Sequence, residues 1–333
     1  MTGLATPDVE LSADLVYSHA GGRPRLLDLY LPRHSTRPLP VIVWLHAGGW
    51  RSGDRKQAPD LSRHFAAHGF AMASIDYRLS REATFPAQLH DVKAAIRWLR
   101  TNTERLGLDG RRIGLWGASA GGHLATLAAL TPDSASEPAE LGSESVGSES
   151  VGSESVGSES VGSESVDSDP NAAADVQCVV TAYAPMDFLV MDAQRDAAKI
   201  EVDDPSAFVL PPGARTGDAR SYESLLIGAP IHDRPDLAHA ASPLGYVTAD
   251  APPFLIVHGR SDRAVPAQQS VMLHRALVRV GAEVTLHLID GRGHGFLDRA
   301  DTAPALTLSV IEAFFRRHLT DTTFDRPASD GAP

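Results

Sequence analysis

The sequence is poor in cysteine, in lysine and in long apolar stretches. Its single cysteine, Cys178, excludes a disulfide within the chain, and the apolar run around it predicts a buried thiol. No apolar run is long enough to span a membrane, and the N-terminal part lacks the basic and apolar regions of a signal peptide. We therefore expect a cytoplasmic protein with no membrane partner.

Positive charge is also scarce, but the imbalance is local. The net charge is -12, and the segment 133–170 holds ten acidic residues and no base, so the remainder carries only -2. This balance gives no reason to expect a nucleic-acid partner. Within the segment the pentapeptide Gly-Ser-Glu-Ser-Val occurs five times, from Gly142 to Val166. Such a polar repeat buries too little apolar surface to fold, which predicts a disordered acidic insertion.

Outside this insertion, apolar runs with strand character alternate with helical patterns. This alternation predicts an α/β protein whose sheet is mostly parallel, with helices on both faces and ligands bound beyond the carboxyl ends of the strands. The expected strands are Leu26–Leu31, Val41–Leu45, Phe70–Asp76, Arg112–Trp116, Val176–Tyr183, Phe254–His258 and Val284–Ile289. The expected helices are Ala58–His68, Pro86–Asn102, Ala120–Leu130, Pro266–Val280 and Ala303–Leu319.

A glycine-rich turn follows the expected strand Arg112–Trp116. It reads Gly117-Ala118-Ser119-Ala120-Gly121-Gly122 and leads into a helix. This is the G-x-S-x-G pattern, in which a serine stands on a sharp turn and side chains at the flanking positions would clash. The pattern is weak alone, but its place between a strand and a helix predicts that Ser119 is a nucleophile.

A second glycine-rich turn, His46-Ala47-Gly48-Gly49-Trp50, follows the expected strand Val41–Leu45. Esterases place the oxyanion loop at this position, upstream of the serine. Glycines allow the backbone to aim its N–H groups at a developing negative charge. An ordinary Gly-Gly turn is the alternative interpretation.

The candidate general base is His294, one of fourteen histidines. It lies in the glycine-rich loop Gly291–Phe296 after the last expected strand, where an imidazole could reach the serine hydroxyl. Three other histidines are weaker candidates: His123 in the expected helix after the serine is more typical of packing or capping, His258 at the end of an expected strand is more typical of loop orientation, and His287 lies within an expected strand.

The candidate acid is Asp262, on the loop after the expected strand Phe254–His258. The chain order Ser119, Asp262, His294 is the order that this kind of catalytic site uses. Three other carboxylates remain as alternatives, although each is more typical of a turn or a cap: Asp187, Asp290 and Asp298.

Taken together these motifs resemble the α/β-hydrolase carboxylesterases, and among them the bifunctional-feruloyl-esterase-like family, close to the hormone-sensitive-lipase group. The resemblance covers nearly the whole chain except the acidic repeat and part of 192–220. The matching segments are Leu27–Pro32, His46–Trp50, Asp76–Ser80, Gly117–Gly122, Ser242–Pro243, Asp262 and Gly293–Phe296.

The resemblance implies a single α/β-hydrolase domain over 1–333, with an eight-stranded sheet and a small cap over 187–242. It implies Ser119, Asp262 and His294 as the catalytic triad, with no cofactor and no metal. It also implies an oxyanion hole formed by the backbone N–H groups of Gly48, Gly49 and Ala120. The family usually has glycine where this chain has Ala47. We further expect the substrate pocket to be bordered by Trp50, Tyr77 and His46.

The expected activity is hydrolysis of a small-molecule ester through an acyl-enzyme. A triad does not identify the leaving group, so an amide-cleaving or peptide-cleaving hydrolase of the same fold remains open. A non-catalytic binding protein on this scaffold is the third hypothesis. An oligomer is possible, but nothing in the sequence indicates one.

Overall fold

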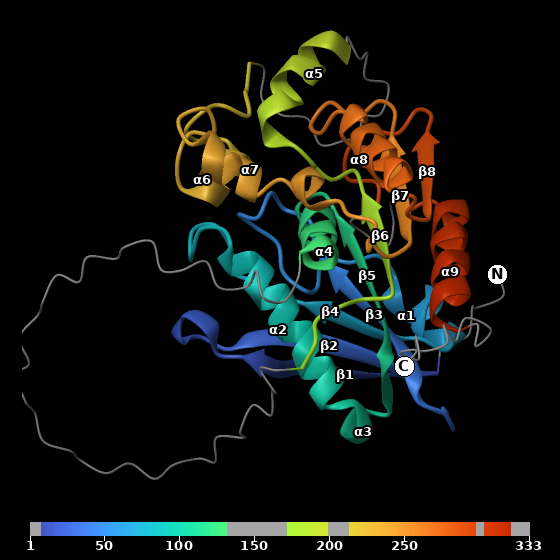
Figure 1. Ribbon diagram of the computed structural model, residues 1–333. Helices are drawn as coiled ribbons and strands as arrows, with labels where there is room; N and C mark the ends of the chain where they lie inside the picture. The colour runs from blue at the N-terminus through green and yellow to red at the C-terminus, as the bar shows by residue number, and fades with distance from the viewer. Residues whose placement is uncertain (1–7, 132–171, 199–212, 298–302, 321–333) are drawn as a thin grey trace, which may run out of the picture.

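The computed structural model describes residues 8–131, 172–198, 213–297 and 303–320. Its centre is an eight-stranded sheet in the order β1-β2-β4-β3-β5-β6-β7-β8 (Figure 1). The strands are β1 (Val9–Ser18), β2 (Arg25–Pro32), β3 (Leu39–Leu45), β4 (Ala71–Ile75), β5 (Leu108–Ala118), β6 (Cys178–Ala182), β7 (Phe254–Gly259) and β8 (Val284–Ile289).

The first two strand pairs, β1 with β2 and β2 with β4, are antiparallel, and every pairing from β4 to β8 is parallel. The predicted α/β class and mostly parallel eight-stranded sheet are confirmed. The α-helices of the described residues are α1 (Leu61–His64), α2 (Ala87–Thr101), α3 (Thr103–Leu106), α4 (Ala120–Leu130), α5 (Met191–Ala198), α6 (Tyr222–Ile227), α7 (Pro235–Ala240), α8 (Gln268–Arg279) and α9 (Ala305–Leu319).

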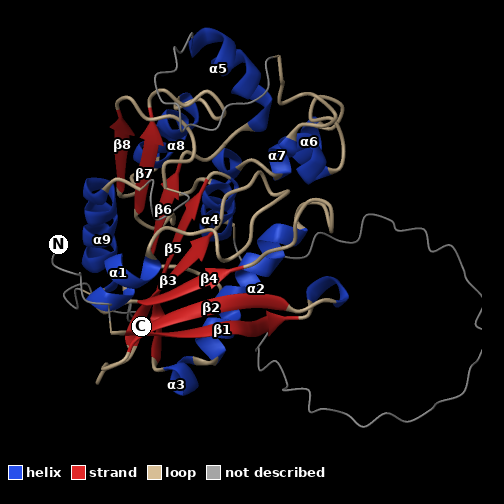
Figure 2. Cartoon of the chain, turned by 180° about the vertical axis from the view of Figure 1, so that it is seen from behind, coloured by secondary structure: helices blue, strands red, loops and turns tan. Residues whose placement is uncertain are grey.

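Helices lie on both sides of the sheet (Figure 2), and two apolar clusters of buried residues pack on its two faces. Along β3 the side chains alternate between them, because successive residues of a strand point to opposite faces. Val41, Val43 and Leu45 belong to the cluster that includes residues of α2, α4 and α8. Ile42 and Trp44 belong to the cluster that includes residues of α1 and α9. A strand buried on both faces explains why this part of the sequence is continuously apolar.

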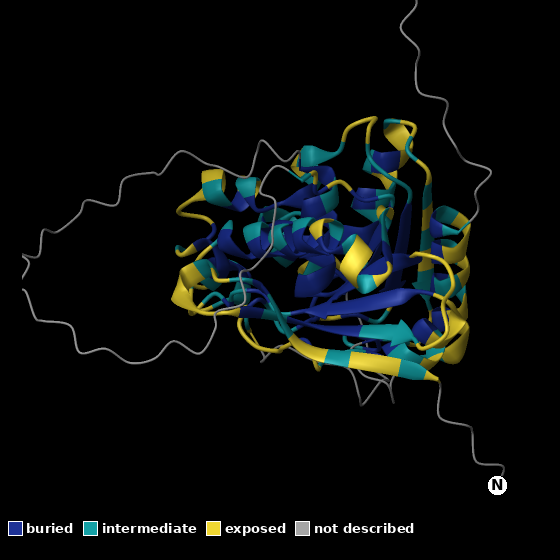
Figure 3. Cartoon of the chain, turned by 90° about the horizontal axis from the view of Figure 1, so that it is seen from below, coloured by how far each residue is buried: buried dark blue, intermediate teal, exposed yellow. Residues whose placement is uncertain are grey.

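The three helices α5, α6 and α7 lie beyond the carboxyl ends of the parallel strands, at the top of Figure 1. They fall within 187–242, where the sequence predicts a cap; that assignment and the single-domain boundary stay predictions. Figure 3 shows the inner strands of the sheet as the buried centre of the molecule, with exposed residues on the edge strands β1 and β8 and on the surrounding helices and loops.

Two elements differ from the expectations. The edge strand β1 is missing from the prediction, because register shifts between Ser12 and Leu15 and between Val16 and Ser18 disrupt its apolar alternation. The predicted helix Ala58–His68 is wrong as one element. The side chain of Asp60 caps the N–H of Arg63, so α1 begins only at Leu61, and a separate 3₁₀ turn covers Ala66–His68.

The predicted acidic insertion, 133–170, lies outside the described residues. Among the helices that are described, none has the length and apolarity needed to cross a bilayer. The cytoplasmic location and the exclusion of nucleic-acid and membrane partners stay predictions.

Candidate active site

Ser119 lies on the sharp turn between β5 and α4, with a backbone φ of 52° that L-residues rarely adopt. The turn passes so close to its neighbours that the motif glycines are required. A Cβ on Gly117 would lie 2.2 Å from the carbonyl oxygen of Gly121, and one on Gly121 would lie 2.0 Å from the carbonyl oxygen of Leu45. The Ser119 N–H donates to the Ala182 carbonyl at 2.8 Å, which fixes the turn to β6.

The three residues chosen from the sequence meet at the carboxyl edge of the sheet. The Nε2 atom of His294 lies 2.9 Å from the Ser119 hydroxyl oxygen, and its Nδ1 atom lies 2.7 Å from Oδ2 of Asp262. Because a carboxylate only accepts hydrogen bonds, Nδ1 carries a proton and Nε2 is left to accept from the serine hydroxyl. Asp262 is fully buried, whereas Ser119 and His294 retain 8% and 7% exposure, enough for contact with a substrate.

The Asp262 carboxylate is held by four hydrogen bonds. Oδ1 accepts from the N–H groups of Ala264 and Val265, both at 2.9 Å, and Oδ2 faces His294 and, at 3.2 Å, the Nε2 atom of His258. Burial alone would raise the pKa of Asp262. The attraction of His294 and the hydrogen bonds from His258 and His294 outweigh burial and hold that pKa well below its usual range. The carboxylate therefore stays ionised beside the imidazole.

His258 is the site residue whose role the sequence did not reveal. Its position at the end of a predicted strand suggests a role in orienting the loop. In the structure its Nε2 faces both the Asp262 carboxylate and the Val265 carbonyl, the latter at 3.0 Å. Two acceptors on Nε2 place the proton there, and Nδ1 then accepts from the Ser270 hydroxyl at 2.7 Å. The only available signal was its position at the end of β7, four residues before Asp262.

The alternative acids lie elsewhere. The Asp187 side chain accepts from the Leu189 N–H at 3.0 Å and caps a 3₁₀ turn. Asp290 pairs with Arg260 at 2.8 Å, at an exposed position. Asp298 lies outside the described residues. His287 lies within β8, as expected from the sequence.

The predicted oxyanion loop runs past the serine turn. Gly48 and Gly49 have φ values of 119° and 58°. A Cβ on Gly48 would lie 2.1 Å from the Ser52 carbonyl oxygen, and one on Gly49 would lie 2.8 Å from the Tyr222 ring, so both positions require glycine. Within the described chain, the N–H groups of Gly48 and Gly49, and that of Ala120 at the first position of α4, donate no hydrogen bond to another protein group.

Ala47, where the family usually has glycine, fits the loop without strain. Its φ is not among the positive values of the chain, and its side chain is 3% exposed. An L-residue at this position therefore leaves the turn around Gly48 and Gly49 intact.

Trp50 connects this loop to the helix behind the serine. Its indole N–H donates to Nδ1 of His123 at 3.2 Å, and Nε2 of His123 donates to the Ala241 carbonyl at 2.6 Å. Burial lowers the pKa of His123 to about 4, although the hydrogen bond to Ala241 opposes the shift. The ring of Phe188 packs edge-on against Trp50, with 5.6 Å between ring centroids.

A cavity of about 240 Å³ opens beside Ser119 and His294. It is bounded by the oxyanion loop, by the loop after β7 and by residues of α5 and α6. The lining residues are Ala47, Gly48, Gly49, Trp50, Ser52, Gln57, Ser119, Pro185, Arg195, Tyr222, Glu223, Ala264, Val265 and His294.

Of the three residues expected at the pocket, only Trp50 lines it. Tyr77 and His46 are 2% and 1% exposed and contact each other instead. The Tyr77 hydroxyl donates to the His46 carbonyl at 2.8 Å, and the two rings stack at 4.2 Å. Both side chains therefore pack internally, and the hydrogen bond from Tyr77 fixes the start of the predicted oxyanion loop.

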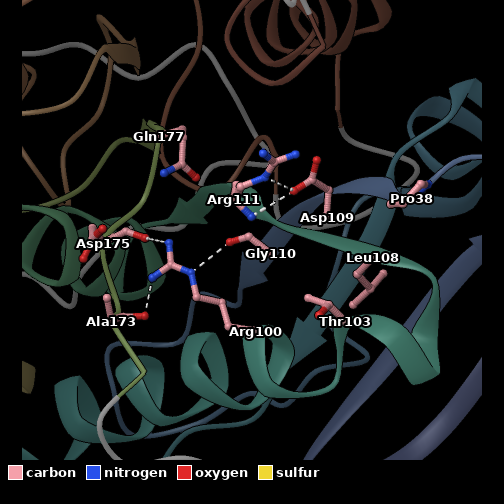
Figure 4. A pocket seen from close by; sticks show the side chains of 10 residues that line it. All are labelled: Pro38, Arg100, Thr103, Leu108, Asp109, Gly110, Arg111, Ala173, Asp175 and Gln177. Carbon is pink, nitrogen blue, oxygen red and sulfur yellow. Dashed lines mark hydrogen bonds and ion pairs between the residues drawn. The ribbon is translucent and has the colours of Figure 1, made fainter. Parts of the chain in front are cut away.

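A larger cavity, of about 630 Å³, lies at the opposite, amino-terminal edge of the parallel strands (Figure 4). Its most prominent side chain, Arg100, points along the wall and donates to the carbonyls of Gly110, Ala173 and Asp175. No histidine, serine or cysteine lines it, so it offers no imidazole base and no serine or cysteine nucleophile. The described residues also contain no group of three or more His, Cys, Asp or Glu side chains arranged to hold a metal ion.

The strand order and the position of the serine turn at the carboxyl edge of the sheet are those of the α/β-hydrolase fold. The BD-FAE family model matches residues 27–277, and the chain belongs to this family.

The relatives are esterases by name. The chain is 32% identical over 300 residues to "Esterase LipC" of Mycobacterium tuberculosis, and the alignment covers 88% of this chain and 62% of LipC. It is 31% identical over 295 residues to "Esterase LipQ" of the same organism, covering 87% of this chain and 58% of LipQ. The chain thus spans less than two thirds of the length of these relatives.

Among solved structures, a truncated form of a carbohydrate esterase from gut microbiota superposes with a TM-score of 0.68 at 26% identity. The superposition covers 96% of this chain and 100% of that one.

Proposed function

We propose that this protein is a serine carboxylesterase that hydrolyses small-molecule esters through an acyl-enzyme intermediate. The observation that carries the proposal is the hydrogen-bonded chain Ser119–His294–Asp262. Ser119 and His294 line a cavity of about 240 Å³. A cavity of this size suits a short acyl chain or a single aromatic ring better than a long lipid chain.

In the first half-reaction the Ser119 oxygen attacks the ester carbonyl while Nε2 of His294 takes the hydroxyl proton. The negative charge that develops on the carbonyl oxygen is stabilised by the N–H groups of Gly48, Gly49 and Ala120, which have no partner within the described protein. The buried carboxylate of Asp262 holds the imidazole in orientation and stabilises its positive charge. His294 then gives its proton to the departing alcohol.

In the second half-reaction water attacks the acyl-enzyme. His294 removes a proton from that water, the tetrahedral intermediate uses the same N–H groups, and the proton returns to Ser119 as the acid leaves. Every step uses side chains and backbone groups of this chain.

The direct test is cleavage of 4-nitrophenyl acetate by the wild type and by Ser119→Ala. We expect turnover by the wild type and loss of nearly all of it in the variant. A fluorophosphonate probe should label the wild type and not the variant, which separates a catalytic serine from a binding site on the same scaffold. Retention of most activity in Ser119→Ala would contradict the assignment.

The names of the relatives support an ester rather than an amide as the bond that is cleaved. A matched pair, 4-nitrophenyl acetate and 4-nitroacetanilide, measures this preference. Faster turnover of the anilide, despite its poorer leaving group, would assign the protein to amide hydrolysis instead.

A further inference from the structure

A second cavity, of about 270 Å³, adjoins the catalytic pocket on the side of α5 and α6. The two cavities share Arg195, Tyr222 and Glu223 as common wall residues. The outer cavity therefore lies next to the cavity that Ser119 lines. The lining residues are Arg51, Arg195, Ala214, Arg215, Thr216, Asp218, Arg220, Ser221, Tyr222 and Glu223.

Arginine dominates this outer cavity. Four arginines line it, against two carboxyl groups. Two of the arginines are fixed by ion pairs: Arg195 donates to Asp192 at 2.8 Å, and Arg215 donates to both carboxylate oxygens of Asp196 at 2.7 and 2.8 Å. The positive charges of these two arginines are therefore balanced by Asp192 and Asp196.

The other two arginines, Arg51 and Arg220, have no ion pair in the described part of the chain. Both side chains are exposed, but their backbones are anchored. The N–H of Arg51 donates to the Gly48 carbonyl at 3.1 Å, which attaches it to the oxyanion loop, and Arg220 directly precedes Ser221, the residue that caps α6. Among the described residues, no carboxylate pairs with their guanidinium donors, and both side chains line the cavity.

The two carboxyl groups of the lining do not occupy those donors. Asp218 accepts from the backbone N–H of Arg215 at 2.9 Å. Glu223 is buried in the wall between the cavities, and this burial raises the pKa of its carboxyl although Arg195 lowers it.

We propose that the outer cavity is an anion-binding subsite, and that the preferred substrates are esters that carry a carboxylate a few bonds from the scissile bond. The proposal rests on the proposed esterase function. Guanidinium groups bind carboxylates through paired N–H donors, and two such groups lining one cavity favour a negative charge over a neutral group of the same shape.

The test compares matched charged and neutral substrates. On the acyl side, mono-4-nitrophenyl esters of dicarboxylic acids from succinate to suberate are compared with the same esters capped as primary amides. On the alcohol side, the acetate esters of ω-hydroxy acids are compared with those of the corresponding ω-hydroxy amides. The measured quantity is the ratio of kcat/KM for the charged substrate to kcat/KM for its neutral partner.

For at least one pair we expect this ratio to be about tenfold in the wild type, a preference worth ~1.4 kcal/mol. Arg51→Gln/Arg220→Gln should lower it by at least about fivefold, because both free guanidinium groups are removed. The control, Arg275→Gln/Arg279→Gln, removes two exposed arginines of α8 that do not line this cavity, and should leave the ratio unchanged. In the wild type the ratio should also fall as salt rises from about 0.1 M to about 1 M, since the Debye length shrinks from about 10 Å to about 3 Å.

The outcomes separate the two proposals. If neutral esters are hydrolysed but no charged substrate is preferred, or if the preference survives in Arg51→Gln/Arg220→Gln, the subsite is wrong and the esterase function stands. Equal loss of the preference in the α8 control would also overturn it, because the effect would then be one of overall charge. If no ester is hydrolysed, charged or neutral, the proposed function fails, and the subsite fails with it.

Discussion

Acidification from pH 7 to about 4.5 should destabilise this protein through His123. The imidazole is fully buried, its Nδ1 accepts from the Trp50 N–H, and its Nε2 donates to the Ala241 carbonyl. A second ring proton on Nδ1 would face the indole N–H, a donor against a donor, in a site without solvent. The folded protein therefore holds His123 neutral, and its pKa is lowered from 6.5 to about 4.

The free energy of unfolding depends on pH because the folded and unfolded chains bind this proton at different pH values. Between pH 6.5 and about 4 the unfolded chain takes up a proton at this residue and the folded chain does not, so the free energy of unfolding falls as pH falls. At ~1.36 kcal/mol per pH unit the full loss is about 3 kcal/mol, of which about 2 kcal/mol appears between pH 7 and pH 4.5. Below pH 4 this contribution stops changing.

The assay is urea denaturation followed by tryptophan fluorescence at both pH values, for the wild type and for His123→Gln. Glutamine retains a donor and an acceptor but does not titrate. We expect the pH-dependent loss of stability to be smaller in His123→Gln by about 2 kcal/mol. The control His239→Gln removes an exposed histidine of α7 and should keep the wild-type loss. An identical loss in His123→Gln and in the wild type would refute the reasoning.

Three further predictions concern the catalytic site. Asp262→Asn should lower kcat for 4-nitrophenyl acetate by about 10⁴-fold, because an amide cannot orient and stabilise the imidazolium as the carboxylate does; a loss below about tenfold would contradict its role. His258→Asn should lower kcat by roughly tenfold with little change in KM, because Asp262 loses one of its partners; an effect on KM alone would argue against positioning. Gly121→Ala places a Cβ 2.0 Å from the Leu45 carbonyl oxygen and should lower the free energy of unfolding by about 3 kcal/mol or more in urea denaturation, whereas Gly245→Ala, with nothing within 4 Å, should have little effect.

The sequence predicted those parts of the site that local patterns encode. Ser119, Asp262 and His294 each follow a strand that the apolar pattern of the sequence predicts, and parallel strands bring their carboxyl ends to one edge. The glycines of the serine turn were predicted for the reason the structure gives, the lack of room for a Cβ.

The failures have a common cause. Whether a side chain near the site points into the cavity depends on neighbours that are distant in the chain. Tyr77 and His46 turn to each other, while Tyr222 and Glu223 reach the cavity from α6, more than a hundred residues after Ser119. No local sequence pattern separates the pair that packs internally from the pair that lines the cavity, because all four side chains are large and carry polar atoms. The irregular edge strand β1 was missed for a related reason, since its pairing with β2 outweighs its broken alternation.

The sequence by itself determined the α/β class, the serine, histidine and aspartate of the site, and the two glycine-rich turns, because periodicity and backbone strain are local properties. Only the tertiary structure decided which groups surround that site. It placed His258 on the Asp262 carboxylate, joined Trp50 to His123, and assembled Arg51 and Arg220 around one cavity from segments far apart in the chain. Contacts of this kind follow from how the sheet and the helices above it pack together.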